Sequence, residues 1–172
     1  MAWDIIISDI DNTVIDPSER LSPSGEFIPK LWMKDKPIPE IINPIRTLMK
    51  RGYKVVFLTG RNIKEAPYTL LSLIKCGVIL PDELGDKAFL IHHRLKGILP
   101  NIEYKIKFVR KMIERGLNPI LWIEDTFFYE KPSADKLRNF TKSAGITFIE
   151  IKSKKDYANV SKRLESLLLN LT

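Results

Sequence analysis

The sequence predicts an α/β protein in which helices cover both faces of a mostly parallel, five-stranded sheet. Three observations lead to this prediction. Five short runs of apolar, β-branched or aromatic residues have the length of buried strands, and helical patterns lie between them. In addition, 44% of the 172 residues are hydrophobic, which is enough for the core of one ordinary domain. We therefore expect residues 1–172 to form a single domain with a Rossmann-like, three-layer layout.

Each predicted strand is a run of five or six residues. The strands are expected at residues 3–8, 53–58, 87–92, 119–123 and 146–151. Each run is apolar at most positions, as in strands that are covered on both faces. The alternation with helices implies that the strands run parallel.

Helix signals fill the intervals after the first strand. The helices are expected at residues 39–51, 64–75, 101–115, 136–144 and 157–171. Pro44 should kink the first helix or restart it with Asn43 as its cap, and the second helix could begin only at Pro67.

One long segment, residues 16–35, fits neither a helix nor a linker. Its prolines and a glycine exclude one continuous helix, whereas Phe27 and Trp32 are unusual in a disordered chain. We expect an ordered excursion that forms a partial lid over the site.

Composition sets limits on the function. The net charge of +7 suits an anionic partner, although the basic residues are spaced as on solvated helix faces. No apolar run reaches the roughly 20 residues that span a bilayer, so we expect a cytoplasmic protein without membrane contact. The single cysteine, Cys76, excludes an intrachain disulfide. The signatures of P-loop ATPases, serine hydrolases and zinc proteases are missing.

Polar residues follow three of the predicted strands. Asp9 and Asp11 follow the first, Thr59, Gly60 and Arg61 the second, and Glu124 and Asp125 the fourth. In an open α/β sheet, ligands bind beyond the carboxyl ends of the strands, so these side chains should share one site. Lys105, early in the helix that precedes the fourth strand, belongs to the same set.

The two aspartates of the first strand end point to a divalent cation. Residues two apart at a strand end face the same side, so Asp9 and Asp11 can reach one ligand. Their charges repel each other and any phosphate unless a cation lies between them. Together with Asp125 they form an oxygen-only donor set, which favours Mg²⁺ over zinc or copper.

This set can carry out phosphoryl transfer. A carboxylate nucleophile forms an aspartyl-phosphate and divides the displacement into two steps, while a neighbouring acid protonates the leaving oxygen. We assign these roles to Asp9 and Asp11, and expect Thr59 and Lys105 to hold the transferring oxygens. Asn12, Gly60 and Arg61 are expected to contact the substrate.

Each motif alone has a structural explanation. An Asp-x-Asp-x-Thr pattern also forms turns, Thr59 could cap a helix after a strand, and Lys105 could be a surface lysine. The order of all four motifs and their common placement at strand ends favour the catalytic interpretation.

These motifs resemble those of haloacid dehalogenase (HAD) superfamily phosphatases over roughly residues 3–130. DIDNT (9–13) is similar to the first motif, FLTGR (57–61) to the second, Lys105 to the third, and IEDT (123–126) to the fourth. The DKP segment at residues 35–37 and the Thr-x-x-x-Leu segment at 69–73 resemble the branch that contains the 3'-phosphatase domain of polynucleotide kinase.

The resemblance implies a role for each matched residue. Asp9 would be the nucleophile and a metal ligand, Asp11 the acid and a metal ligand through its backbone carbonyl, and Asp125 the third ligand. The presence of an acid at position 11 favours a phosphatase over other activities of the superfamily. Two departures leave questions open, because Glu124 replaces the usual aspartate and Lys107 competes with Lys105 for the third motif.

The spacing of the motifs leaves room for no large cap domain, so the site should be relatively open. We therefore expect a Mg²⁺-dependent phosphomonoesterase whose substrate is a phosphorylated small molecule, such as a nucleotide, or a nucleic-acid phosphate end. The alternatives are a non-catalytic nucleic-acid or protein-binding module on a HAD-like scaffold, and a receiver-like domain that is stably phosphorylated.

Overall fold

The computed structural model describes residues 3–24, 26, 28–94 and 101–170, and of residues 92–94 only the backbone. Its centre is a five-stranded sheet with the order β5-β4-β1-β6-β7, in which all neighbouring strands are parallel. The strands are β1 (Asp4–Ser8), β4 (Lys54–Asn62), β5 (Ala88–Arg94), β6 (Asn118–Asp125) and β7 (Thr147–Ile151). The predicted α/β class with five parallel strands is confirmed.

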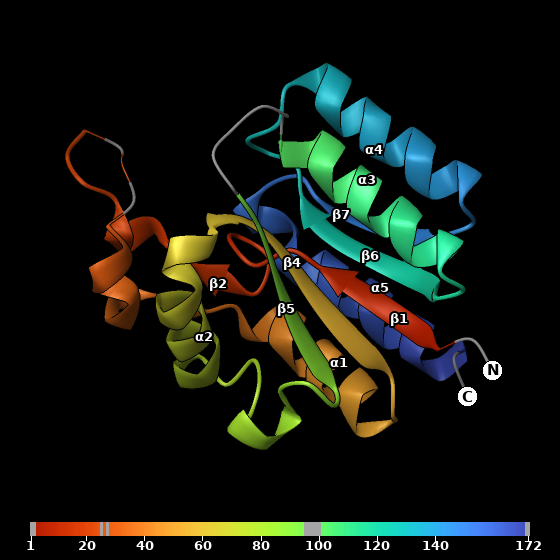
Figure 1. The fold of residues 1–172 in the computed structure, drawn as a ribbon, viewed down its shortest axis with the longest axis horizontal. Helices are drawn as coiled ribbons and strands as arrows, with labels where there is room; N and C mark the ends of the chain where they lie inside the picture. The colour runs from red at the N-terminus through yellow and green to blue at the C-terminus, as the bar shows by residue number, and fades with distance from the viewer. Residues whose placement is uncertain (1–2, 25, 27, 95–100, 171–172) are drawn as a thin grey trace.

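Helices cover both faces of the sheet, as Figure 1 shows. The helices are α1 (Pro39–Lys50), α2 (Ala66–Lys75), α3 (Asn101–Glu114), α4 (Lys131–Ser143) and α5 (Tyr157–Asn170). Side chains of β1 alternate between the two layers: Ile6 packs with α1 and α5, whereas Ile5 and Ile7 pack with α3 and α4. Both layers are apolar, and this explains why the strands are hydrophobic at nearly every position.

Three strands extend further than predicted, among them β5, which ends at Arg94 where residue 92 was expected. The strand expected to end at residue 58 continues as β4 to Asn62, and the one expected to end at residue 123 continues as β6 to Asp125. The expectation that Thr59, Gly60 and Arg61 come after the end of the second strand is therefore wrong, because they lie within β4. Backbone pairing with the neighbouring strand β5 continues past them, with a shift in register between Thr59 and Asn62.

The helices differ from the prediction mainly at their starts. α1 is one helix with Pro44 inside it, so the predicted restart at Asn43 is wrong; the Pro44 ring is buried with the apolar face of the helix. α4 begins at Lys131, five residues before the predicted start, with a proline in its first turn. α2 is preceded by a 3-10 turn, Ile63–Glu65.

The excursion after β1 is closed at its base by a short antiparallel pair, β2 (Ile15–Asp16) and β3 (Lys36–Pro37). It holds two 3-10 segments, η1 (Ser18–Arg20) and η2 (Pro29–Lys34), and it projects beside α2 in Figure 1. Further 3-10 turns are η4 (Pro81–Glu83) and η5 (Lys154–Asp156). Of the two aromatic residues predicted for a lid, Trp32 is half-buried, and Phe27 lies outside the described residues.

Among the described residues, no helix combines the length and the apolar character that crossing a bilayer requires.

Candidate active site

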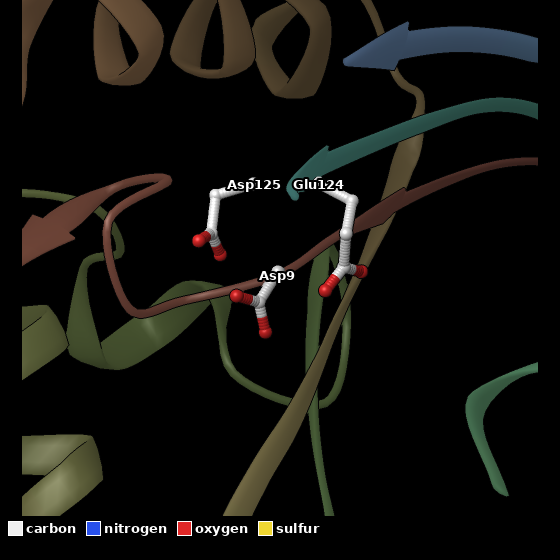
Figure 2. Close-up of side chains that lie close together, drawn as sticks. All are labelled: Asp9, Glu124 and Asp125. Atoms are coloured by element: carbon white, nitrogen blue, oxygen red, sulfur yellow. The ribbon is translucent and has the colours of Figure 1, made fainter. Parts of the chain in front are cut away.

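The candidate site lies where β1 and β6 end side by side. Asp9 directly follows β1, and its backbone N–H donates to the carbonyl of Ile123 in β6 at 2.9 Å. Asp125 is the last residue of β6. Figure 2 shows the carboxylates of Asp9, Glu124 and Asp125 gathered at this point, and all three residues are buried. As their places at strand ends predicted, Asp9 of the first motif lies beside Glu124 and Asp125 of the fourth.

Lys105 projects from the first turns of α3 into this cluster. Its side chain is fully buried, and its Nζ donates to Oδ1 of Asp9 at 2.6 Å and to Oε1 of Glu124 at 2.5 Å. Lys107, the competing candidate, is exposed on the other side of the helix. The lysine at the site is therefore Lys105.

Glu124 is held by three donors. In addition to Lys105, the Tyr129 hydroxyl donates to Oε1 at 2.6 Å, and the indole N–H of Trp122 donates to Oε2 at 2.9 Å. Both carboxylate oxygens thus already have protein partners. The sequence left the role of Glu124 open, and the contacts indicate that it anchors Lys105.

The charges of the cluster do not balance. Burial, together with the charges of Asp9 and Glu124, raises the pKa of Asp125 to about 9. Burial also raises the pKa of Glu124 to about 7, although Lys105 opposes the shift. For Lys105, burial lowers the pKa, but Asp9 and Glu124 outweigh it and hold the pKa well above its usual value. Three acids face one lysine, so the site favours an additional positive charge.

The donor set fits a hard divalent cation. Asp9, Glu124 and Asp125 each offer an oxygen, and these oxygens lie within 4.8 Å of one another. A carboxylate-only cluster of this size could hold Mg²⁺, which prefers oxygen donors. Because Glu124 already binds three donors, Asp9 and Asp125 are the more accessible ligands. The carboxylate of Asp11, a predicted ligand through its backbone, is not part of the cluster.

Asp11 instead faces Arg61. The Arg61 guanidinium forms a bidentate ion pair with the Asp11 carboxylate: Nη2 donates to Oδ1 at 2.5 Å, and Nε donates to Oδ2 at 2.9 Å. Burial lowers the pKa of Arg61, but the charge of Asp11 outweighs this effect and raises the pKa overall. The Thr59 hydroxyl accepts from the backbone N–H of Arg61 at 3.1 Å, which fixes the local chain. Asp11, the predicted acid, is thus bound to Arg61, one of the predicted substrate contacts.

The loop after Asp9 is fixed by its own hydrogen bonds. Asn12 has a φ of +55°, in the left-handed region where asparagine is better tolerated than most residues. Its backbone carbonyl accepts from the Tyr157 hydroxyl at 2.8 Å. The Thr13 hydroxyl accepts from the N–H of Asp125 at 3.2 Å, so the first and fourth motifs are directly linked.

A cavity of about 740 Å³ opens onto this cluster. Six predicted site residues line it: Asp9, Asp11, Asn12, Gly60, Arg61 and Asp125. Thr59 and Lys105 are fully buried and are not among the lining residues. The excursion contributes one wall through Pro17, Ser18, Arg20, Leu21 and Glu26, so it borders the site as predicted, although Trp32 does not.

Sequence reasoning missed several residues of this cavity. They include Arg20, Phe128, Tyr129 and Lys154, which lie in irregular segments where no periodic pattern marks them. Asn101, which the sequence marked only as the start of a helix, also lines the cavity. It also packs against Gly60 so closely that a Cβ there would lie 2.8 Å from its side-chain amide. That contact gives Gly60 a steric reason to be glycine.

Comparison with known proteins gives no sequence-level relative. The sequence matches no protein-family model, and none of the curated proteins compared with it is significantly similar. Solved structures do match. A chain of the Pnkp1/Rnl/Hen1 RNA repair complex aligns with a TM-score of 0.65 at 15% identity, over 87% of this chain. The present chain spans only 42% of that protein.

Class C acid phosphatase from Bacillus anthracis matches over most of its length. The tungstate-bound structure aligns with a TM-score of 0.58 at 14% identity, covering 96% of this chain and 79% of the phosphatase. A second structure of that enzyme gives 0.58 at 16% identity, covering 94% and 79%. At such identities the likeness concerns the fold alone. This chain has the fold of HAD-type phosphatases, as the resemblance of its motifs implied.

Proposed function

We propose that this chain is a Mg²⁺-dependent phosphomonoesterase that works through an aspartyl-phosphate on Asp9. The observation that carries the proposal is the buried contact of Lys105 with Asp9 beside Asp125, at the floor of an open cavity. A buried cluster with excess negative charge is costly to fold. That cost is understandable if the cluster holds a cation and a phosphate during function.

In the first step, the Asp9 oxygen that Lys105 does not hold, Oδ2, attacks phosphorus. A bond forms between Oδ2 and phosphorus, the bond to the leaving oxygen breaks, and Asp11 gives that oxygen a proton. In the second step, Asp11 takes a proton from water, which attacks phosphorus and releases phosphate and free Asp9. Lys105 holds Asp9 in one orientation and offsets its charge through both steps.

Mg²⁺, when bound by Asp9, Asp125 and the backbone carbonyl of Asp11, would neutralise phosphate charge near the nucleophile. Glu124 is assigned a positioning role, because its oxygens hold Lys105, Tyr129 and Trp122. Thr59 and Lys105 remain proposed phosphate holders, and Asn12, Gly60 and Arg61 proposed substrate contacts.

The proposed acid must move before it acts. Arg61 donates to both oxygens of Asp11, and an oxygen that accepts from a guanidinium is not the one that carries a proton. Asp11 therefore has to turn at least one oxygen toward the leaving group. A substrate phosphate that attracts Arg61 would release it.

The substrate class follows from the cavity and the charge. The cavity is much larger than a phosphate group requires. Its lining includes Arg20, Arg61 and Lys154, each paired with an aspartate in this structure, together with five acidic residues, so a bound cation would favour the entry of an anionic ligand. A net charge of +7 also suits a polyanion. A nucleotide or a nucleic-acid phosphate end fits these features. The match to a chain of an RNA repair complex supports this choice.

The test is hydrolysis of p-nitrophenyl phosphate and of 3'- and 5'-phosphorylated oligonucleotides, with and without Mg²⁺. Asp9→Asn should abolish turnover, whereas Asp4→Asn, at the exposed opposite end of the same strand, should leave it unchanged. If wild type and Asp9→Asn release phosphate equally, the mechanism is wrong. Salt-dependent oligonucleotide binding without any phosphate release would favour the binding-module alternative.

A further inference from the structure

Phe128 is a large apolar side chain that the fold leaves exposed beside the site. It is 74% accessible, as much as any large hydrophobic residue described in this structure, yet it lines the same cavity as Asp9 and Asp125. Its two neighbours in the chain, in contrast, are partly buried. Phe127 packs against the core on one face of the sheet, and Tyr129 against the core on the other.

The segment that carries Phe128 is a fixed turn. The backbone N–H of Tyr129 donates to the carbonyl of Thr126 at 3.0 Å, so Phe127 and Phe128 are the central residues of the turn. The ends of the turn are held by side chains: the Thr126 hydroxyl donates to Glu150 at 2.6 Å, and the Tyr129 hydroxyl to Glu124 at 2.6 Å. The Phe128 ring is therefore presented by a rigid support.

Phe127 supports the exposed ring from behind. The two ring centroids lie 4.9 Å apart with the planes tilted by 42°, a favourable aromatic contact. Phe128 thus has one neighbouring ring and leaves much of its remaining surface for a ligand. A planar group that stacks on it would remove apolar surface from water.

The position of the ring relative to the phosphate chemistry identifies the ligand class. Tyr129, next to Phe128, is tied to the same Glu124 that holds Lys105, so the ring is connected to the catalytic cluster through one residue. A cavity of about 740 Å³ holds a sugar and a base in addition to a phosphate. Bases stack on aromatic side chains, whatever their sequence, because each base has a π face.

We propose that Phe128 is a stacking platform for the nucleobase next to the phosphate, and that it makes the site selective for nucleoside phosphates over phosphate esters without a base. This inference rests on the function proposed above, and it concerns which phosphate ester is bound. Phe128 touches the base and takes no part in bond breaking.

The test measures equilibrium binding in the Asp9→Asn background with Mg²⁺ present, so that turnover does not consume the ligand. Two ligand pairs differ only in the base: adenosine 5'-monophosphate with ribose 5-phosphate, and a 3'-phosphorylated dinucleotide with the same molecule lacking its last base. In at least one pair the base should strengthen binding about tenfold. Phe128→Ala should reduce this preference to less than about threefold, and Phe128→Trp should retain it.

Trp3→Ala is the matched control. Trp3 is another exposed aromatic residue, but it precedes β1 and so lies at the end of that strand opposite to the site. It should leave the preference intact. The proposal is overturned if neither pair shows a preference, or if Phe128→Ala keeps it. Failure of the proposed function would look different, since wild-type protein would then release no phosphate even where the base preference is intact.

Discussion

At the scale of single residues, the site depends on how Glu124 holds Lys105. A buried ammonium needs partners, and Lys105 has two carboxylates within 2.6 Å. Only one of them, Asp9, is available to the cavity, because Glu124 is fully buried and binds two further donors. Glu124 therefore determines where the lysine charge lies.

We predict that Glu124→Gln lowers the free energy of unfolding by about 2 kcal/mol, since the amide places a donor among three existing donors. Phosphatase activity should fall because Lys105 loses one anchor, whereas Mg²⁺ affinity should fall much less than in Asp125→Asn. The control is Glu103→Gln, which alters an exposed pair with Lys136 and should cost about 0.5 kcal/mol or less. Urea unfolding and magnesium titration provide the measurements. Equal losses of Mg²⁺ affinity in Glu124→Gln and Asp125→Asn would make Glu124 a ligand instead.

At the scale of elements, a buried ion pair ties the excursion to the sheet. Arg20 of η1 donates to Asp35, just after η2, at 3.3 Å, and both side chains are almost fully buried. Asp35 also accepts from Ser72 of α2 at 2.5 Å and lies 3.7 Å from Arg61. Burial raises the pKa of Asp35 and lowers that of Arg20, so both charged forms are maintained at a cost.

Removal of one partner of the Arg20–Asp35 ion pair should therefore lower the stability of the protein strongly. We predict that Asp35→Ala costs about 3 kcal/mol of stability, because Arg20 loses its nearest carboxylate inside the protein and keeps Glu65, at 3.9 Å, as a more distant ion-pair partner. Glu19→Ala breaks an exposed pair with Lys36 at the same excursion and should leave the stability nearly unchanged. Guanidinium unfolding of both variants decides the matter. Similar small losses would mean that water reaches Arg20 readily.

The sequence predicted the elements better than the contacts between them. Hydrophobic runs and spacing located five strands, and the strand-end rule placed Asp9 and Asp125 together. The end of β4 was missed because its pairing with β5 continues through polar residues. The Arg20 contact could not be predicted, because it joins two irregular segments 15 residues apart without any periodic pattern.

At the scale of the whole molecule, the fold concentrates negative charge at one sheet edge of a protein whose net charge is +7. Lys105 and Glu124 are fully buried inside the fold, whereas Asp9 and Asp125, at the ends of β1 and β6, line the cavity. The organisation of the chain as one domain stays a prediction, as do the assigned roles of the site residues. What the fold does explain is why a cation should stabilise it.

The stabilisation should depend on pH in a definite direction. The pKa of Asp125 is about 9 in the folded chain against an ordinary value of 3.8, so between these values the folded state binds more protons than the unfolded state. Stability without metal should therefore fall as pH rises through this range. Mg²⁺ replaces the proton, and its effect on Tm should be larger at pH 8 than at pH 5.5. Thermal unfolding with MgCl2, against NaCl at equal ionic strength, measures the difference. Asp125→Asn should lose most of the Mg²⁺ effect and its pH dependence, and an unchanged Mg²⁺ effect in that variant would place the cation elsewhere.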